Sequence, residues 1–255
     1  MKLVTLMENT SCREDICFEH GLSLYLETSE HKILFDAGQS GAFAKNADKL
    51  GVDLRNVDFA VLSHGHYDHS GGLGEFLNCN EAAPVYVSQW AFEPHWESDG
   101  RYVGVDPSLK ESTRIRYVPE KTVLADNITL YRLEREPMDT AGLLVEEGGE
   151  RKPDDFRHEQ YLMLEENGKR ILISGCSHKG ILNIMDAFRP DILVGGFHFM
   201  KMEDMSVLRQ AAEKLLQYDT VYYTGHCTGL KQYAFLKDLM GDRLHYISAG
   251  TILKI

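Results

Sequence analysis

The segment Ser63-His64-Gly65-His66-Tyr67-Asp68-His69 carries four metal-ligating side chains within six residues. It follows the compact apolar run Asp58-Phe-Ala-Val-Leu-Ser63, which is typical of a strand buried on both faces. Side chains two residues apart in extended backbone point the same way, so His64 and His66 can converge on one metal ion. Asp68 and His69 follow where the chain turns and can face a second ion. Imidazole together with carboxylate suits zinc, iron or manganese.

Outward from this segment, the sequence predicts both strands and helices. Before it, Gly21–Glu27 and His31–Asp36 are typical of a hairpin. After it, Ser70-Gly-Gly-Leu predicts a helix start with Ser70 as the N-cap. Towards the C-terminus strand–helix units dominate, and a helix over 203–218 shows apolar residues at helical spacing. We predict an α/β fold of two packed sheets with helices outside, in one domain over 1–255.

Two segments show no clear hydrophobic period. Glu146–Phe156 is predicted to be a charged loop, and residues 90–120 to be an insertion or lid within the domain. Aromatic rings with arginines can stack on a heterocycle and hold a phosphate, but they can equally form a packed lid or a dimer contact. The residues concerned are Trp96, Tyr102, Tyr117, Arg101, Arg114 and Arg116.

The pattern His-x-His-x-Asp-His after a buried strand resembles the metallo-β-lactamase superfamily, and the resemblance covers nearly the whole chain. Phe35-Asp36-Ala37-Gly38 is similar to an early strand of that superfamily, whose acid usually braces the metal loop. The resemblance implies a four-layer αββα sandwich with the site at one edge, between the two sheets. It gives Asp36 the role of structural support for the metal loop.

The resemblance also implies where the remaining metal ligands lie. His158 and Cys176 are 176 − 158 = 18 residues apart, similar to the superfamily's third and fourth ligand positions. The fourth is usually an aspartate that bridges two metals, so Cys176 departs from the hydrolase pattern. Its thiolate either favours zinc at that position or leaves the position unused as a bridge. His226, in Thr224-Gly-His-Cys227, matches the fifth motif, while Cys227 is expected to pack. The implied sets are His64, His66 and His158 for the first ion, and Asp68, His69 and His226 for the second, with Cys176 between or beside them.

Further polar residues follow apolar strands at the expected rim of the site. His178 and His198 are candidates for proton donation to a leaving group, and His178 is also an alternative to His158 as a ligand. Lys179 is a candidate contact for a substrate anion. Gly-Cys-Ser-His, Gly-Gly-Phe-His and Gly-His-Cys-Thr-Gly resemble the branch named after the 7,8-dihydropterin-6-yl-methyl-4-(β-D-ribofuranosyl)aminobenzene 5′-phosphate synthase of methanopterin biosynthesis.

The resemblance implies a metal-dependent hydrolase or phosphoester-type transferase with two divalent ions, zinc in the first place and manganese or iron otherwise. Asp68 could also orient the attacking water, and a small, phosphorylated or pterin-like substrate would fit the branch. Two alternatives come from other classes. One is a di-iron redox protein, which usually has a carboxylate at the bridging position and an attached flavin domain. The other is a non-catalytic, metal-dependent ligand-binding protein.

The composition of the chain limits the partners and the cellular compartment that we expect. The 255 residues carry a formal charge of −12, which argues against nucleic acid as a partner, because that affinity comes from Lys and Arg. We find no apolar run long enough for a bilayer and no signal peptide, and therefore expect no membrane association. Five sparse cysteines suit a reducing cytoplasm. A small molecule is the expected partner, and self-association into a homo-oligomer stays open.

Overall fold

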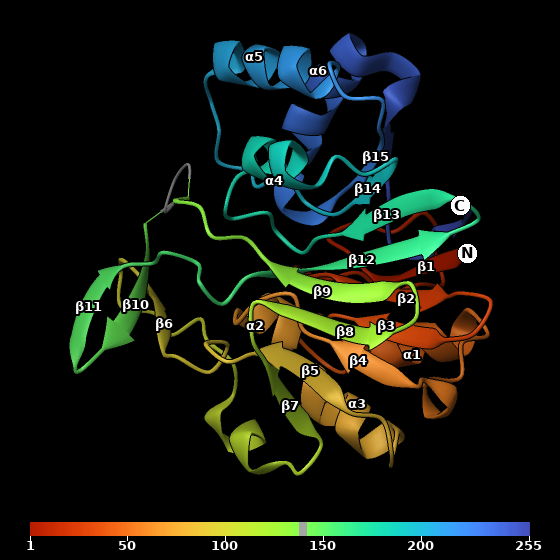
Figure 1. Ribbon diagram of the computed structural model, residues 1–255, viewed down its shortest axis with the longest axis vertical. Helices are drawn as coiled ribbons and strands as arrows, with labels where there is room; N and C mark the ends of the chain where they lie inside the picture. Colours follow the sequence, from red (N-terminus) through yellow and green to blue (C-terminus); the bar gives the residue numbers. More distant parts are fainter. Residues whose placement is uncertain (138–141) are drawn as a thin grey trace.

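The computed structural model describes residues 1–137 and 142–255, in which two large sheets face each other (Figure 1). The first has seven strands, mixed in direction, with β3, β4, β5 and β7 parallel. In spatial order they are β17 (Ile252–Lys254), β1 (Lys2–Met7), β2 (Ser23–Glu27), β3 (Lys32–Phe35), β4 (Phe59–Val61), β5 (Val85–Ser88) and β7 (Ile115–Val118).

The second sheet also has seven strands in the described chain, and its run from β13 to β16 is parallel. In spatial order they are β16 (Leu244–Tyr246), β15 (Val221–Thr224), β14 (Ile192–Val194), β13 (Lys169–Ile173), β12 (Gln160–Glu166), β9 (Ile128–Arg132) and β8 (Lys121–Ala125). The strands β12 and β13 form an antiparallel hairpin that turns at Glu166–Lys169.

Helices cover the outer face of each sheet (Figure 1). The α-helices are α1 (Ala42–Lys49), α2 (Tyr67–Ser70), α3 (Leu73–Cys79), α4 (Ile181–Phe188), α5 (Met205–Leu215) and α6 (Leu230–Met240). The short 3-10 helices are η1 (Leu54–Asn56), η2 (Pro107–Glu111), η3 (His226–Thr228) and η4 (Gly241–Arg243). No helix in the described ranges has both the length and the apolar character needed to cross a bilayer.

Three apolar clusters hold these layers together. Leu24, Phe35 and Leu162 belong to the cluster between the two sheets. Phe43 of α1 packs against the outer face of the first sheet, and Leu208 of α5 against the outer face of the second. Central strands such as β4 and β14 therefore bury side chains on both faces, as their apolar sequences require. The predicted four-layer αββα sandwich is confirmed.

The charged segment 146–156 is not the loop that we predicted. Its first two residues end β10 (Leu143–Glu147), which pairs with β11 (Glu150–Pro153) around Gly148-Gly149, and β6 (His95–Glu97) completes a small sheet. Both glycines have positive φ, which suits a tight turn. The hairpin was missed because its strands are mostly polar and lack alternation. This small sheet extends to one side of the sandwich (Figure 1).

The helix after the histidine segment begins differently from our prediction. Ser70 does not cap it but ends the short helix α2, and its hydroxyl donates to the carbonyl of His66 at 2.9 Å. Helix α3 begins at Leu73, after Gly72. The residues 90–120, predicted as a lid or insertion, are divided between β6 in the small sheet and β7 in the first large sheet.

Candidate metal centre

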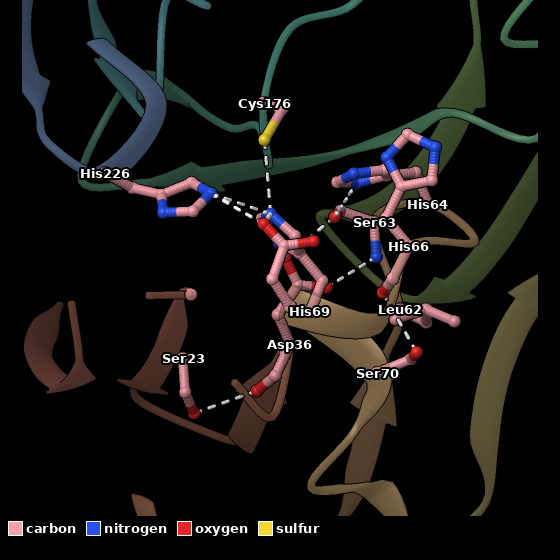
Figure 2. Close-up of polar contacts among 12 residues, drawn as sticks. Ser23, Asp36, Leu62, Ser63, His64, His66, His69, Ser70, Cys176 and His226 are labelled. Carbon is pink, nitrogen blue, oxygen red and sulfur yellow. Dashed lines mark hydrogen bonds and ion pairs between the residues drawn. The ribbon is translucent and has the colours of Figure 1, made fainter. Parts of the chain in front are cut away.

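The histidine segment leaves the carboxyl end of β4 and is braced by Asp36, the residue after β3. One Asp36 oxygen accepts the Ser63 N–H at 2.7 Å, and the other accepts the Ser63 hydroxyl at 2.7 Å and His69 Nδ1–H at 2.6 Å (Figure 2). Gly65 lies so close to the chain that a Cβ there would be 2.3 Å from the Ala91 carbonyl oxygen. Asp36 therefore lies against the metal loop, where the sequence predicts it.

A first group of potential ligands comprises Asp68, His69, Cys176 and His226, all buried, with their donor atoms within 4.8 Å of one another. His69 Nε2 lies 3.1 Å from Cys176 Sγ and 3.2 Å from His226 Nε2 (Figure 2). The Asp68 carboxylate is 3.2 Å from His226 Nε2. The structure thus brings together the residues expected around the second ion, with Cys176 among them.

A second group comprises His64, Cys176 and His178. The His66 ring lies 4.6 Å from that of His64 and 4.9 Å from that of His178, so it stands next to this group. His178, the alternative to His158 in our prediction, is therefore the histidine that the structure places beside His64 and Cys176.

The bare ring nitrogens of these histidines fit a bound cation. The Ser63 hydroxyl gives its hydrogen to Asp36, so it must accept Nδ1–H from His64 at 2.8 Å, which leaves His64 Nε2 without a proton. That Nε2 is buried and has no hydrogen-bond partner. The same is true of both ring nitrogens of His178. Buried polar atoms without partners are rare in proteins, and a divalent ion would satisfy these. The donor set therefore fits the metal that the sequence predicts.

A third group joins His66, His95, Asp154 and His158. His158 Nδ1 accepts the Gly65 N–H at 2.8 Å, and its Nε2 faces Asp154 at 3.3 Å, so both nitrogens have partners. The His158 ring centroid lies 5.9 Å from that of His64 and 5.2 Å from that of His66, but its nitrogens contact Gly65 and Asp154. Sequence reasoning missed His95 and Asp154, because neither follows an apolar strand nor belongs to a recognisable spacing.

Burial and neighbouring charges set the protonation of the centre. Burial holds the pKa values of His64, His66 and His178 well below the ordinary value, so these rings are neutral and able to bind a cation. Although burial opposes it, the carboxylates of Asp36 and Asp68 raise the pKa of His69 to about 9. Burial also raises the pKa of the Cys176 thiol well above its ordinary value, and a bound ion would reverse this effect.

The first and second groups open into one pocket at the edge of the sandwich. Its lining includes the predicted His178 and His198, and also His20, which sequence reasoning did not select. His20 Nε2 contacts the Asp68 carboxylate at 3.2 Å. Lys179, our candidate anion contact, is turned away, because its ammonium donates to the Asp155 carbonyl at 2.5 Å and the residue is 6% exposed. The cations that line the pocket are instead Arg101 and Lys201.

Known proteins match this arrangement along the whole chain. The model of the metallo-beta-lactamase superfamily matches residues 18–226, which include the histidine segment and His226. The chain belongs to the metallo-beta-lactamase superfamily. The metallo-beta-lactamase fold thus accounts for the two sheets, the outer helices and the edge site.

Three known proteins match almost all of the chain. The 7,8-dihydropterin-6-methyl-4-(beta-D-ribofuranosyl)-aminobenzene-5'-phosphate synthase of Methanocaldococcus jannaschii is 27% identical over 100% of this chain and 96% of its own. Protein MJ0448 of the same organism is 29% identical over 98% of both chains. The crystal structure of Tm1679, described as a metal-dependent hydrolase of the beta-lactamase superfamily, matches with a TM-score of 0.86 and 29% identity over 100% and 99%. The predicted resemblance to the superfamily and its synthase branch is confirmed.

Proposed function

We propose that the chain is a metal-dependent hydrolase that acts on a small phosphorylated molecule. The observation that carries the proposal is the meeting of two buried ligand groups at one pocket, joined through Cys176. We assign Asp68, His69, Cys176 and His226 to one ion, and His64, His66 and His178 to the other. A thiolate among imidazoles favours zinc. Ions held there would lower the pKa of a water molecule and polarise the bond to be broken.

Asp68 is the residue that we assign to orient the attacking water. Its carboxylate lines the pocket and is held by His20 Nε2 and His226 Nε2, each at 3.2 Å. Although burial opposes it, His69 and hydrogen bonds from His20 and His226 keep the pKa of Asp68 well below its ordinary value. The carboxylate is therefore ionised at neutral pH and can accept a hydrogen bond from water.

His198 is the residue that we assign to the leaving group. It follows β14, has a positive φ of 57°, lines the pocket and lies 4.3 Å from the His178 ring, measured between ring centroids. A histidine at the mouth of a site can carry a proton near neutral pH and pass it from a ring nitrogen to a departing oxygen. His178 lies deeper, beside His64, and serves as a ligand.

The pocket wall indicates a substrate with an apolar body and an anionic end. Val103, Leu143 and Met202 supply apolar surface. Arg101 is paired with Glu97 at 2.7 Å, whereas Lys201 is exposed in the pocket lining, and we therefore assign the anion contact to Lys201. The name of the synthase relative includes a dihydropterin and a phosphate, and this supports such a substrate. Five free cysteines support a reducing cytoplasmic setting.

The test is hydrolysis of bis(p-nitrophenyl) phosphate by zinc-loaded protein, with zinc measured on the same sample. We expect Asp68→Asn to lower kcat by about 100-fold or more, because the orienting carboxylate is lost. His31→Gln, on a half-buried histidine outside the three groups, should leave kcat unchanged. A folded protein that takes up no transition metal would overturn the proposal.

A transferase is the second candidate, and the observation that favours it is the synthase at 27% identity over the full chain. The same pocket would then admit a second substrate in place of water. A zinc-loaded protein that leaves simple phosphodiesters intact but joins two substrates with release of a phosphate-containing product would support this candidate.

A further inference from the structure

We propose that Asn9 is a positioning residue that fixes the tautomers of two pocket histidines, His20 and His226. This role rests on the proposed function, in which His226 holds an ion and Asp68 orients the attacking water. Asn9 follows β1 and His20 precedes β2, both in the first sheet, whereas His226 follows β15 of the second. The rings of His20 and His226 lie 4.9 Å apart, measured between their centroids. Asn9 therefore meets both rings where side chains from the two sheets come together.

The side-chain amide of Asn9 has one orientation that satisfies its neighbours. The Gly21 N–H can only donate, so the Asn9 atom that lies 3.1 Å from it is the oxygen, Oδ1. The same Oδ1 lies 2.8 Å from His226 Nδ1, and the amide nitrogen Nδ2 lies 3.3 Å from His20 Nδ1. Because the oxygen only accepts and the NH₂ group only donates, this amide makes opposite demands on the two rings.

The two rings consequently carry their protons on different nitrogens. His226 donates from Nδ1 to Asn9, and the Nε2 of the neutral ring is left for an ion. His20 accepts from Asn9 at Nδ1, so the proton of its neutral ring is on Nε2, which lies 3.2 Å from the Asp68 carboxylate. Asn9 thus turns an acceptor towards the ion and a donor towards the carboxylate that orients water.

The backbone on either side of Asn9 is held by the carboxylate of Glu8, which is fully buried. One Glu8 oxygen accepts the His226 N–H at 2.5 Å and the Tyr246 hydroxyl at 2.9 Å. The other accepts the N–H and the hydroxyl of Thr10, each at 2.7 Å. His226 has a positive φ of 50°, which is costly for a residue with a side chain, and these bonds hold it in that conformation. Glu8 therefore fixes the two segments against each other, and Asn9 selects the ring nitrogens.

The rival explanation is that Asn9 only closes its loop through the Gly21 N–H. Any side chain that accepts this hydrogen bond would then replace it. Aspartate separates the two explanations, because it accepts from Gly21 and His226 as asparagine does but cannot donate to His20. Leucine, which has a similar size, can neither accept nor donate.

The first experiment reads the ring nitrogens of Asn9→Asp and of the wild type in full-length, zinc-loaded protein. Histidine labelled with a nitrogen isotope distinguishes protonated from bare ring nitrogens in long-range proton–nitrogen spectra at pH 8, and His20→Gln and His226→Gln assign the signals. In the wild type we expect a bare Nδ1 and a protonated Nε2 for His20. In Asn9→Asp the bare Nδ1 signal should disappear, because a carboxylate draws a proton to that nitrogen.

The second experiment measures zinc affinity, which depends on His226. Asn9→Leu should bind zinc about 10–100-fold more weakly, the usual cost of losing the partner of a ligating histidine. Asn9→Asp should bind zinc at least as tightly as the wild type, because it keeps the acceptor for His226 Nδ1. Asn78→Asp and Asn78→Leu, at an exposed position of α3, are the matched controls and should change neither the spectra nor the affinity.

A bare Nδ1 of His20 that persists in Asn9→Asp would overturn the role of Asn9, and so would wild-type zinc affinity in Asn9→Leu. If no sample takes up zinc, the proposed function is overturned, and the ring nitrogens of His20 still decide the role of Asn9. If the Asn9 variants fail to fold, the wild-type spectrum decides, since a proton on Nδ1 of His20 would contradict the proposal.

Discussion

Asp36 acts at the scale of a single residue, because one buried carboxylate fixes both ends of the histidine segment. It is 1% exposed, and it receives hydrogen bonds from Ser63 and His69. Ser63 in turn sets the tautomer of His64, and Asp36 sets that of His69 directly. Both histidines consequently turn Nε2 towards the centre, and outer hydrogen bonds of this kind raise metal affinity.

Asp36→Asn should therefore weaken metal binding without collapsing the fold. Asparagine tolerates the positive φ of 60° at this position, so the change removes mainly the charge. Loss of such an outer partner typically costs 10–100-fold in metal affinity, as an approximate range. Zinc competition with a chromophoric chelator measures the change. Asp58→Asn, at a half-exposed carboxylate distant from the centre, is the control, and equal affinities in both variants would contradict the role of Asp36.

The metal-free protein should be most stable near pH 6.5, because buried histidines shift in opposite directions. The pKa of His69 is raised to about 9, so the folded state binds more protons than the unfolded state between pH 6.5 and 9, and stability falls as pH rises through that window. Burial lowers the pKa values of His95 and His226 to about 4. The unfolded state then binds more protons between pH 4 and 6.5, and stability falls as pH is lowered.

Urea unfolding of chelator-treated protein at pH 4.5, 6.5 and 9 measures this profile. His95→Gln lacks one of the buried histidines that act on the acid side, so its loss of stability between pH 6.5 and 4.5 should be smaller than that of the wild type. A free energy of unfolding that increases steadily from pH 6.5 to pH 9 would contradict the assignment to His69.

At the scale of elements, the centre exists because strand ends from two sheets meet at one edge. Asp36 follows β3 and the histidine segment follows β4, while Cys176, His198 and His226 follow the parallel strands β13, β14 and β15. Ligands commonly bind at the carboxyl ends of parallel strands. Gln160 joins the two sheets there, since its N–H donates to the Ser63 carbonyl at 2.8 Å.

Helix α6 positions one wall of the pocket through Gln232. Its side-chain amide donates to the carbonyls of Met200 and Met202, each at 3.0 Å. Gln232→Ala should loosen this loop, and the Met200 amide, which donates to the Cys227 carbonyl at 2.9 Å, should exchange hydrogen roughly 5–30-fold faster. Hydrogen exchange followed by mass spectrometry measures this. Gln210→Ala, at an exposed position of α5, is the control and should leave exchange unchanged. An unchanged exchange rate in Gln232→Ala would contradict the role of Gln232.

At the scale of the whole molecule, stability comes from the apolar layer between the two sheets. Leu162 of β12 is fully buried in that layer. Leu162→Ala should lower the free energy of unfolding by about 2–5 kcal/mol, because a cavity would remain between two packed sheets. Leu230→Ala, at a residue that is 57% exposed, should change it by about 0.5 kcal/mol or less. Equal effects in chemical denaturation would contradict this view of the core.

Most of the sandwich was predictable because its strands are apolar and short, and its helices amphipathic. The polar hairpin β10–β11 could not be predicted, because its charged strands show no hydrophobic period. The start of α3 could not be predicted either, because Gly72 is no capping signal. In the centre, the histidine segment and His226 were recognisable from local spacing. His95 and Asp154 were not, because their proximity depends on a β-bridge pattern that joins β6 to β10.

The superfamily, the layered fold and the residues of the histidine segment follow from the amino-acid sequence alone, because they depend on local period and on spacing within a few residues. Three further features depend on tertiary packing: His178 lies beside His64, His158 joins His95 and Asp154, and Lys179 points away from the pocket. The physical reason is that these contacts join strand ends and loops far apart in the chain, whose meeting is set by sheet order and by the packing of one sheet on the other.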